Sequence, residues 1–245
     1  MRGPGLHTIY AREDGVGCRL ATREELNTLL KRDPNQRLHV ISPIRTFNLS
    51  PAETGLTIVL RGTEQLHGFP EAENAFNRAK ALWESLIQTP ITVIVDVDFG
   101  PTRFGQPYPQ GVLGSTDSQD LGADGIYPDV RAALIAGASN PQEAAIYNSL
   151  PANTIPTDRG DVAFMIGPSS VFRALGFISA VADPDAEQED FGDPPSIGFN
   201  SNFTYDFNPD DGIAPGSIDF DAVAVHELGH VLGFVSNVGL GEISD

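Results

Sequence analysis

Cysteine is almost missing from this sequence, because Cys18 is the only one among 245 residues. A single thiol cannot form a disulfide within the chain, and a zinc site built from several cysteines is excluded as well. Apolar runs of membrane-spanning length are also missing, so we expect no transmembrane segment. The opening residues, MRGPGLHTIY, lack the apolar core of a secretion signal. The chain is therefore either not exported, or an exported form without its signal, or a segment that begins after it.

Basic residues are few: 15 Lys and Arg stand against 33 Asp and Glu, which gives a formal net charge of −18. Such a surface repels phosphate backbones, so we expect no nucleic-acid partner. We interpret this charge mainly as a solvated acidic surface. Clustered carboxylates can in addition hold hard cations such as calcium.

The composition supports a folded protein, with 40% hydrophobic residues and 14 Phe available for a core. The length suits one large domain, or one domain with an appendage. Residues 1–50 are weakly periodic and are interpreted as an N-terminal extension that contains one short helix at 22–32. Residues 51–245 carry the regular patterns and are interpreted as the main domain.

A strand–helix–strand unit is the clearest of these patterns. GLTIVLRG (55–62) and PITVIVDVDFG (90–100) have the composition of strands. Between them, residues 70–88 repeat apolar residues at helical spacing and begin with a proline. Such a crossover places both strands in one sheet with the helix on its face. We also expect short helices at 127–139 and 141–150, a strand at 161–167, an acidic loop at 182–196 and a half-exposed strand at 197–208.

The most informative stretch is FDAVAVHELGHVLGF, residues 220–234. We expect a helix over 220–232, capped by Asp219 or Ser217 and ended by Gly233. This helix is apolar nearly all round, apart from three residues in its middle, and a helix of that kind is buried. Buried charge needs a partner or a metal ion.

The three residues are His226, Glu227 and His230. Histidines four residues apart are offset by about 40° around the helix and about 6 Å along it, so both imidazoles can face one ion. Glu227 lies about 100° round from His226, where it can touch a water on the metal. Zinc lowers the pKa of that water to roughly 7, and Glu227 would pass its proton to the leaving amine. The alternative is a chance HExxH whose buried side chains have other partners.

HELGHVLGF resembles the first two-thirds of the metzincin signature, H-E-x-x-H-x-x-G-x-x-H. The wider block YDFNPDDGIAPGSIDFDAVAVHELGHVLGFVS is similar to a bacterial family of secreted metalloproteases, many of which carry a PEP-CTERM sorting tail. The resemblance covers about residues 55–240. It implies an α+β, metzincin-like fold with a twisted mixed sheet, a backing helix and an active-site helix. It also implies a secreted zinc endopeptidase for protein or peptide substrates, with His226 and His230 as zinc ligands and Glu227 as general base and acid.

The third zinc ligand is open. Ser236 occupies the slot of the third metzincin histidine, and a serine hydroxyl is a poor zinc ligand. Glu242, twelve residues after His230, is the alternative in a gluzincin-type peptidase, which takes its third ligand from a following helix. A histidine or carboxylate beyond residue 245 is a further alternative.

Metzincins also place a methionine-containing turn beneath the metal, and the only methionines here, Met1 and Met165, precede the motif. We therefore expect the chain to be truncated after the active-site helix, with the C-terminal subdomain missing. A zinc site left incomplete in this way would favour a different class of protein, a catalytically silent binding module with a zincin fold.

A calcium site is one interpretation of DFNPDDG, residues 206–212. Asp206, Asn208 and Asp210 alternate as in the first half of a calcium loop, but the glycine falls one place late for an EF-hand. A turn that caps the next helix is the alternative to a looser calcium site. By the same family resemblance, the strand in GFNSNFTYDF, residues 198–207, is an edge strand that pairs with extended substrate.

Overall fold

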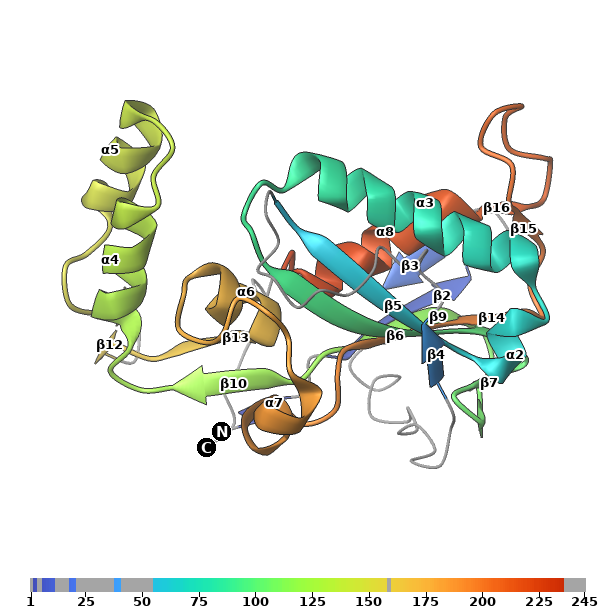
Figure 1. Cartoon of the computed structure of the whole chain (residues 1–245), viewed down its shortest axis with the longest axis horizontal. Coiled ribbons are helices and arrows are strands. Elements are labelled where there is room, and N and C mark those ends of the chain that lie inside the picture. The colour runs from blue at the N-terminus through green and yellow to red at the C-terminus, as the bar shows by residue number, and fades with distance from the viewer. Residues whose placement is uncertain are drawn as a thin grey trace.

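The computed structural model describes the chain over the ranges 2–3, 6–11, 18–20, 38–40, 55–157 and 160–235. These residues form a mixed structure with seven helices and a seven-stranded mixed sheet (Figure 1). This arrangement confirms the expected α+β class. The short helix predicted at 22–32 lies outside the described residues, as do Ser236 and Glu242.

The central sheet combines parallel and antiparallel strands. β5 (Thr57–Thr63), β6 (Thr92–Gly100) and β14 (Ser196–Asn200) run parallel to one another. β9 (Val112–Asp117) runs antiparallel to β14 on its other side. The full order is β3-β2-β9-β14-β6-β5-β4, with β2 at Leu6–Ala11, β3 at Cys18–Leu20 and β4 at Leu38–Val40.

Helix α3 (Pro70–Leu86) connects β5 to β6 and covers one face of the sheet, as predicted (Figure 1). Its first residue is a proline, which fits there because the missing N–H would have no helical partner. The short helix α2 (Glu64–His67) precedes it, and Thr63 caps α2. The stripe of α3 that faces the sheet is buried and consists of Ala72, Ala75, Phe76 and Ala79.

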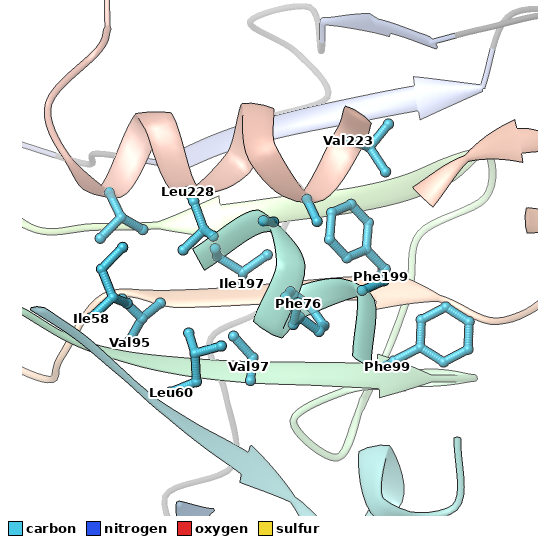
Figure 2. Packing of buried hydrophobic residues seen from close by; sticks show 14 of the residues in the cluster. Ile58, Leu60, Phe76, Val95, Val97, Phe99, Ile197, Phe199, Val223 and Leu228 are labelled. Carbon is cyan, nitrogen blue, oxygen red and sulfur yellow. The ribbon is translucent and has the colours of Figure 1, made fainter. Parts of the chain in front are cut away.

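Helix α8 (Phe220–Val231) lies beside α3 on the same face of the sheet (Figures 1 and 2). The Asp219 carboxylate caps it by accepting a hydrogen bond from the N–H of Ala222 at 3.0 Å. Gly233 follows the helix with a φ of 93°, a conformation that favours glycine. The predicted cap and the predicted stop are thus both confirmed.

Aromatic rings fill the space between α3, α8 and the sheet, and Phe220 lies at their centre with no exposed surface. Figure 2 shows Phe76, Phe99 and Phe199 among the apolar side chains of this core. Edge-to-face and tilted contacts of this kind stabilise a core beyond the area that they bury. The ring centroids 4.9 to 5.4 Å from that of Phe220 belong to Phe76, Phe99, Phe199, Tyr205 and Phe207.

The single strand predicted at 161–167 is divided in the structure. Its first part belongs to β12 (Gly160–Val162), which forms a hairpin with β11 (Ile155–Thr157). Its second part is β13 (Met165–Pro168), which pairs with β10 (Asp120–Ala123). Because the two parts pair with different strands, the apolar segment that looks like one strand in the sequence forms two.

The acidic stretch at 182–196, predicted as a loop, contains the helix α7 (Pro184–Phe191), so that prediction is wrong. Asp183 caps α7 by accepting two backbone N–H bonds from its first turn, where proline and acidic residues also favour a helix start. Glu187 forms an ion pair with the buried Arg173 at 2.6 Å. This contact with another element holds α7 in place.

The stretch at 197–208 is not a half-exposed strand. All five residues of β14 are buried, and β14 pairs with β6 on one side and β9 on the other. A strand that is hydrogen-bonded on both sides has no free edge for an extended peptide. The prediction of a substrate-binding edge strand here is therefore wrong. Further along, β15 (Tyr205–Asp206) pairs with β16 (Ile218–Asp219) and brings the chain to the start of α8.

Helices α4 (Tyr127–Ala136) and α5 (Pro141–Ser149), both predicted, form a hairpin that projects away from the sheet (Figure 1). Among the described ranges, no helix combines the length and the apolar character that a membrane span requires. The remaining short elements are β1 (Arg2–Gly3), the hairpin of β7 (Thr102–Arg103) and β8 (Gln106–Pro107), and α6 (Ser169–Ala174).

Replacement of the central ring by Phe220→Ala is expected to lower the free energy of unfolding by about 3–5 kcal/mol, because it leaves a cavity among packed rings. Urea unfolding measures this. Leu86→Ala is the matched control, since Leu86 is 63% exposed and its loss should cost about 0.5 kcal/mol or less. Equal effects of the two substitutions would contradict the packing of α8 described above.

Candidate metal centre

The three polar side chains of α8 converge. One potential ligand atom from each of His226, Glu227 and His230 lies within 4.8 Å of the other two. The Nε2 atoms of the two histidines are 3.0 Å apart, and the two rings are nearly perpendicular at 85°. His226 is exposed, His230 is half-buried and Glu227 is buried. In the part of the chain that the structure describes, this is the only such trio of His, Cys, Asp or Glu.

The spacing of the two histidines fits zinc. Zinc lies about 2.0–2.1 Å from imidazole nitrogens, so two ligands of one tetrahedral ion are about 3.3 Å apart. The observed Nε2 separation of 3.0 Å is close to this value. The same separation also suits an N–H···N hydrogen bond between the two rings. A measurement of metal binding therefore has to show whether the histidines coordinate an ion or only form a hydrogen bond with each other.

The backbone orients His230. Its Nδ1 lies 2.9 Å from the carbonyl oxygen of Phe234, and a carbonyl only accepts, so Nδ1 carries the hydrogen. The neutral ring then presents an unprotonated Nε2, which is the form that binds a metal. Burial lowers the pKa of His230 and His226 lowers it further, while the Phe234 carbonyl acts in the opposite direction. The net effect favours the neutral ring.

Phe234 is held in turn by Trp83 of α3. Its ring stacks on the indole with centroids 5.0 Å apart, and Trp83 Nε1 donates to the carbonyl of Val225 at 2.9 Å. A Cβ atom at Gly229 would lie 3.1 Å from the indole, so the glycine inside the HExxH motif leaves room for this contact. Helix α3 therefore positions the carbonyl that orients His230.

Glu227 points into the protein, and its exposed fraction is 0%. The Thr116 hydroxyl on β9 donates a hydrogen bond of 2.5 Å to Oε2. Oε1 is buried and has no hydrogen-bond partner among the described residues. A buried oxygen of this kind costs free energy unless a water or ligand meets it. Burial raises the pKa of Glu227 to about 7, against the opposing effects of Thr116 and of the Arg103 charge.

Sequence reasoning missed three residues that shape this group: Thr116, Trp83 and Phe234. Thr116 lies 111 positions before Glu227, and no motif marks it. The one available signal was the buried glutamate itself, because a buried carboxylate in an apolar helix requires a hydrogen-bond donor from another element. That argument predicts a donor without saying which residue it is.

The two candidates for a third ligand within the chain, Ser236 and Glu242, lie outside the described residues. Both stay predictions. The described chain reaches Val235, two residues after the turn at Gly233, and Ser236 follows directly.

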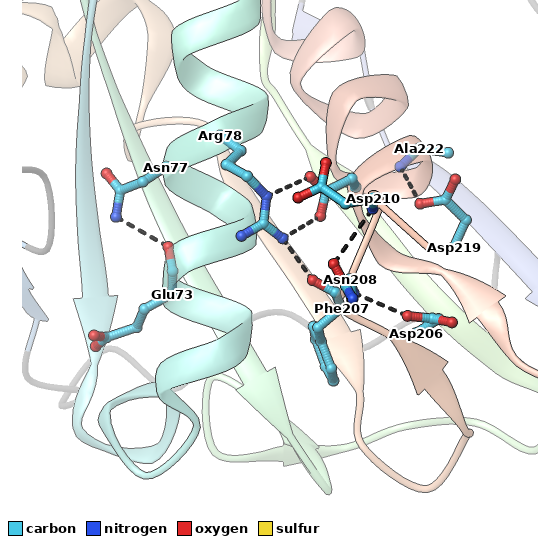
Figure 3. A network of polar contacts seen from close by, with 10 residues as sticks. Glu73, Asn77, Arg78, Asp206, Phe207, Asn208, Asp210, Asp219 and Ala222 are labelled. Atoms are coloured by element: carbon cyan, nitrogen blue, oxygen red, sulfur yellow. Dashed lines mark hydrogen bonds and ion pairs between the residues drawn. The ribbon is translucent and has the colours of Figure 1, made fainter. Parts of the chain in front are cut away.

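The predicted calcium residues lie at the end of β15, which contains Asp206, and in the loop that leads to β16 (Figure 3). Asp206 accepts hydrogen bonds from the N–H groups of Ala214 and Asn208, and Asn208 Oδ1 accepts one from the N–H of Asp210. These two hydrogen bonds lower the pKa of the Asp206 carboxyl group, and the bond from Ala214 has the larger effect. Arg78 of α3 donates to a carbonyl of this loop at 2.8 Å. Contacts of this kind are typical of a turn, which was the alternative to a calcium site in the sequence analysis. The calcium site itself stays a prediction.

Comparison with known proteins adds no relative, since no family model, no curated protein and no solved structure matches this chain. The metzincin resemblance rests on the motif residues quoted above. What the group on α8 can do is therefore argued from its own geometry.

The raised pKa of Glu227 predicts a pH-dependent stability of the protein in a zinc chelator. Unfolded Glu227 titrates near 4.5 and folded Glu227 near 7, so the folded state loses stability as pH rises through this window. Wild type is expected to lose up to about 3 kcal/mol relative to Glu227→Gln between pH 4.5 and 7.5. Urea unfolding of both proteins at several pH values measures the difference. A difference that does not vary with pH would contradict the burial of an ionisable Glu227.

Proposed function

We propose that this protein is a zinc-dependent endopeptidase that hydrolyses peptide bonds in protein or peptide substrates. One observation carries the proposal: two histidine Nε2 atoms lie 3.0 Å apart beside a buried glutamate whose Oε1 lacks a partner among the described residues. Two imidazoles and an adjacent carboxylate on one helix are the residue types that hydrolytic zinc sites of the HExxH kind use.

His226 and His230 would hold the ion through their Nε2 atoms. The hydrogen bond from His230 Nδ1 to the Phe234 carbonyl supports this role, because it leaves Nε2 unprotonated in the neutral ring. When bound, zinc lowers the pKa of a water to roughly 7 and polarises the carbonyl under attack. A third ligand from outside the described residues is part of the proposal.

Glu227 is proposed as the proton carrier. Its Oε2 is occupied by Thr116, so Oε1 is the atom that takes a proton from the attacking water and returns it to the leaving amine. A carboxyl group transfers protons in both directions most efficiently when its pKa lies near the working pH. Burial moves the pKa of Glu227 to about 7, which suits this task.

The arrangement of the elements supports a metzincin-like fold as part of the same proposal. A mixed sheet carries α3 as a backing helix and α8 as the active-site helix on one face. This is the set of elements that the resemblance implies for the upper half of a metzincin cleft. Secretion is proposed on the resemblance alone.

Two alternatives remain distinct from this proposal. A catalytically silent binding module is favoured by the 3.0 Å contact of His226 and His230, because an N–H···N bond satisfies the rings without an ion. A gluzincin-type peptidase would use Glu242 as the third ligand. Zinc content and peptide hydrolysis separate the three.

The first test is metal content. We expect wild type to bind about one zinc ion per chain at micromolar zinc, and both His226→Ala and His230→Ala to lose it, because each removes one of a small set of ligands. Elemental analysis after dialysis measures this. His67→Ala is the matched control, since His67 is an exposed histidine paired with Glu73 at 2.6 Å. Absence of zinc from the wild-type chain would favour the binding module.

The second test is hydrolysis of casein or a quenched peptide. Glu227→Gln is expected to keep zinc but to lower kcat by about 10²–10⁴-fold, because the amide cannot accept the proton. Hydrolysis at the wild-type rate by the zinc-loaded variant would show that the assigned role of Glu227 is wrong.

The third ligand is tested by Glu242→Ala and Ser236→Ala in parallel zinc titrations. Removal of a true ligand should weaken zinc binding by about 10-fold or more, whereas removal of a residue that does not touch the ion should leave it unchanged. Loss of zinc in Glu242→Ala alone would favour the gluzincin-type enzyme. Zinc retained in both variants would place the ligand elsewhere.

A further inference from the structure

Thr116 lies on β9, the antiparallel strand beneath α8. Its side chain is fully buried, and its hydroxyl is 2.5 Å from Glu227 Oε2 and 3.3 Å from the Glu227 carbonyl oxygen. The shorter contact has the length of a strong hydrogen bond to a charged or strongly polar acceptor. The strand thus reaches the motif glutamate directly.

Neighbouring residues of β9 serve opposite faces of the sheet. Ser115 accepts a hydrogen bond of 2.6 Å from Arg103 Nε, whereas Thr116 donates to Glu227. Successive side chains of a strand point to opposite faces, so Thr116 meets Glu227 because its register along β9 places it under α8. A shift by one residue would turn Thr116 to the other face of the sheet, away from Oε2.

This contact makes the two oxygens of Glu227 unequal. Oε2 has a partner in Thr116, while Oε1 has none among the described residues. A carboxylate with one oxygen fixed cannot rotate freely about its last bond, so the direction of the other oxygen is fixed as well.

We propose that Thr116 is a positioning residue, which holds Glu227 Oε2 so that Oε1 faces the reacting water. The proposal rests on the proposed function and deepens it. Glu227 still makes the proton transfer, and Thr116 acts only through it. A misplacement of about 1 Å in a catalytic group can lower a rate by about 10²-fold. Loss of the Thr116 hydroxyl should therefore lower the rate by a measurable amount.

The test is Thr116→Val, which keeps the shape of the side chain and removes the donor. We expect kcat to fall by about 10- to 100-fold with KM within about 2-fold of wild type, because substrate binding does not involve the buried hydroxyl. Zinc affinity should stay at the wild-type value, since Thr116 contacts neither histidine in the described contacts.

Two variants serve as controls. Thr116→Ser keeps the hydroxyl and should restore kcat to within about 3-fold of wild type, because the donor is retained. Ser118→Ala removes a buried hydroxyl just after β9 that has no hydrogen-bond partner among the described residues, and it should leave kcat and KM unchanged. Equal loss in Thr116→Val and Ser118→Ala would assign the effect to packing and would overturn the proposal.

A second readout needs neither zinc nor substrate. At pH 5 in a chelator, the C=O stretch of the protonated Glu227 carboxyl can be assigned by its loss in Glu227→Gln. It should move to higher wavenumber in Thr116→Val and stay in place in Thr116→Ser, since a lost hydrogen bond strengthens the C=O bond. An unmoved band would overturn the positioning role.

The outcomes separate the two proposals. If wild type hydrolyses peptides and Thr116→Val keeps a wild-type kcat, the positioning role fails and the peptidase stands. If wild type binds no zinc and hydrolyses nothing, the peptidase fails and the catalytic role of Thr116 fails with it. In that case the infrared band still reports whether the hydrogen bond exists.

Discussion

The packing of α8 against α3 and the sheet is the constraint on which the candidate site depends. Phe220 anchors this helix among aromatic rings from the sheet, from α3 and from the loop that precedes it. Once α8 is fixed there, Glu227 has to face β9, and the two histidines emerge at the solvent side of the same helix. The apolar packing therefore selects which of the three polar side chains is buried.

That burial has electrostatic consequences. A carboxyl group without exposed surface is held near pKa 7, and it keeps one oxygen on Thr116 and the other without a partner among the described residues. His230 is shifted toward its neutral form by burial, while the Phe234 carbonyl selects its tautomer. The shift of His230 favours the neutral ring, which is the form that binds a metal, and the shift of Glu227 brings its pKa close to neutral pH. Buried polar groups of this type cost stability, and perturbed pKa values cluster at functional sites.

Much of the framework could be predicted because it depends on local patterns. The strand–helix–strand unit around α3, the helices α4 and α5, and both ends of α8 follow from apolar spacing, proline, a capping aspartate and glycine. Two predictions were wrong because they depend on which strands pair in the sheet. The run at 161–167 was divided by two pairing partners, and β14 was predicted to be half-exposed although both its edges are paired. The helix α7 is different, because the segment carries local helix signals, a capping aspartate and a proline at the start, together with a high charge that is also typical of a solvated loop.

The sequence by itself determined the candidate residues of the site: an i, i+4 pair of histidines shares one face of any regular helix, and the glutamate next to the first histidine lies about 100° round from it, because there are 3.6 residues per turn. Only the tertiary structure decided what surrounds them. Thr116 and Trp83 come from a strand and a helix far away in the sequence, and their contacts with Glu227 and Phe234 depend on sheet register and helix packing. Such contacts leave no periodic trace in the sequence, since a single residue meets a single partner. A helical motif can therefore be recognised from its spacing, whereas the groups that orient it become visible only when the chain is folded.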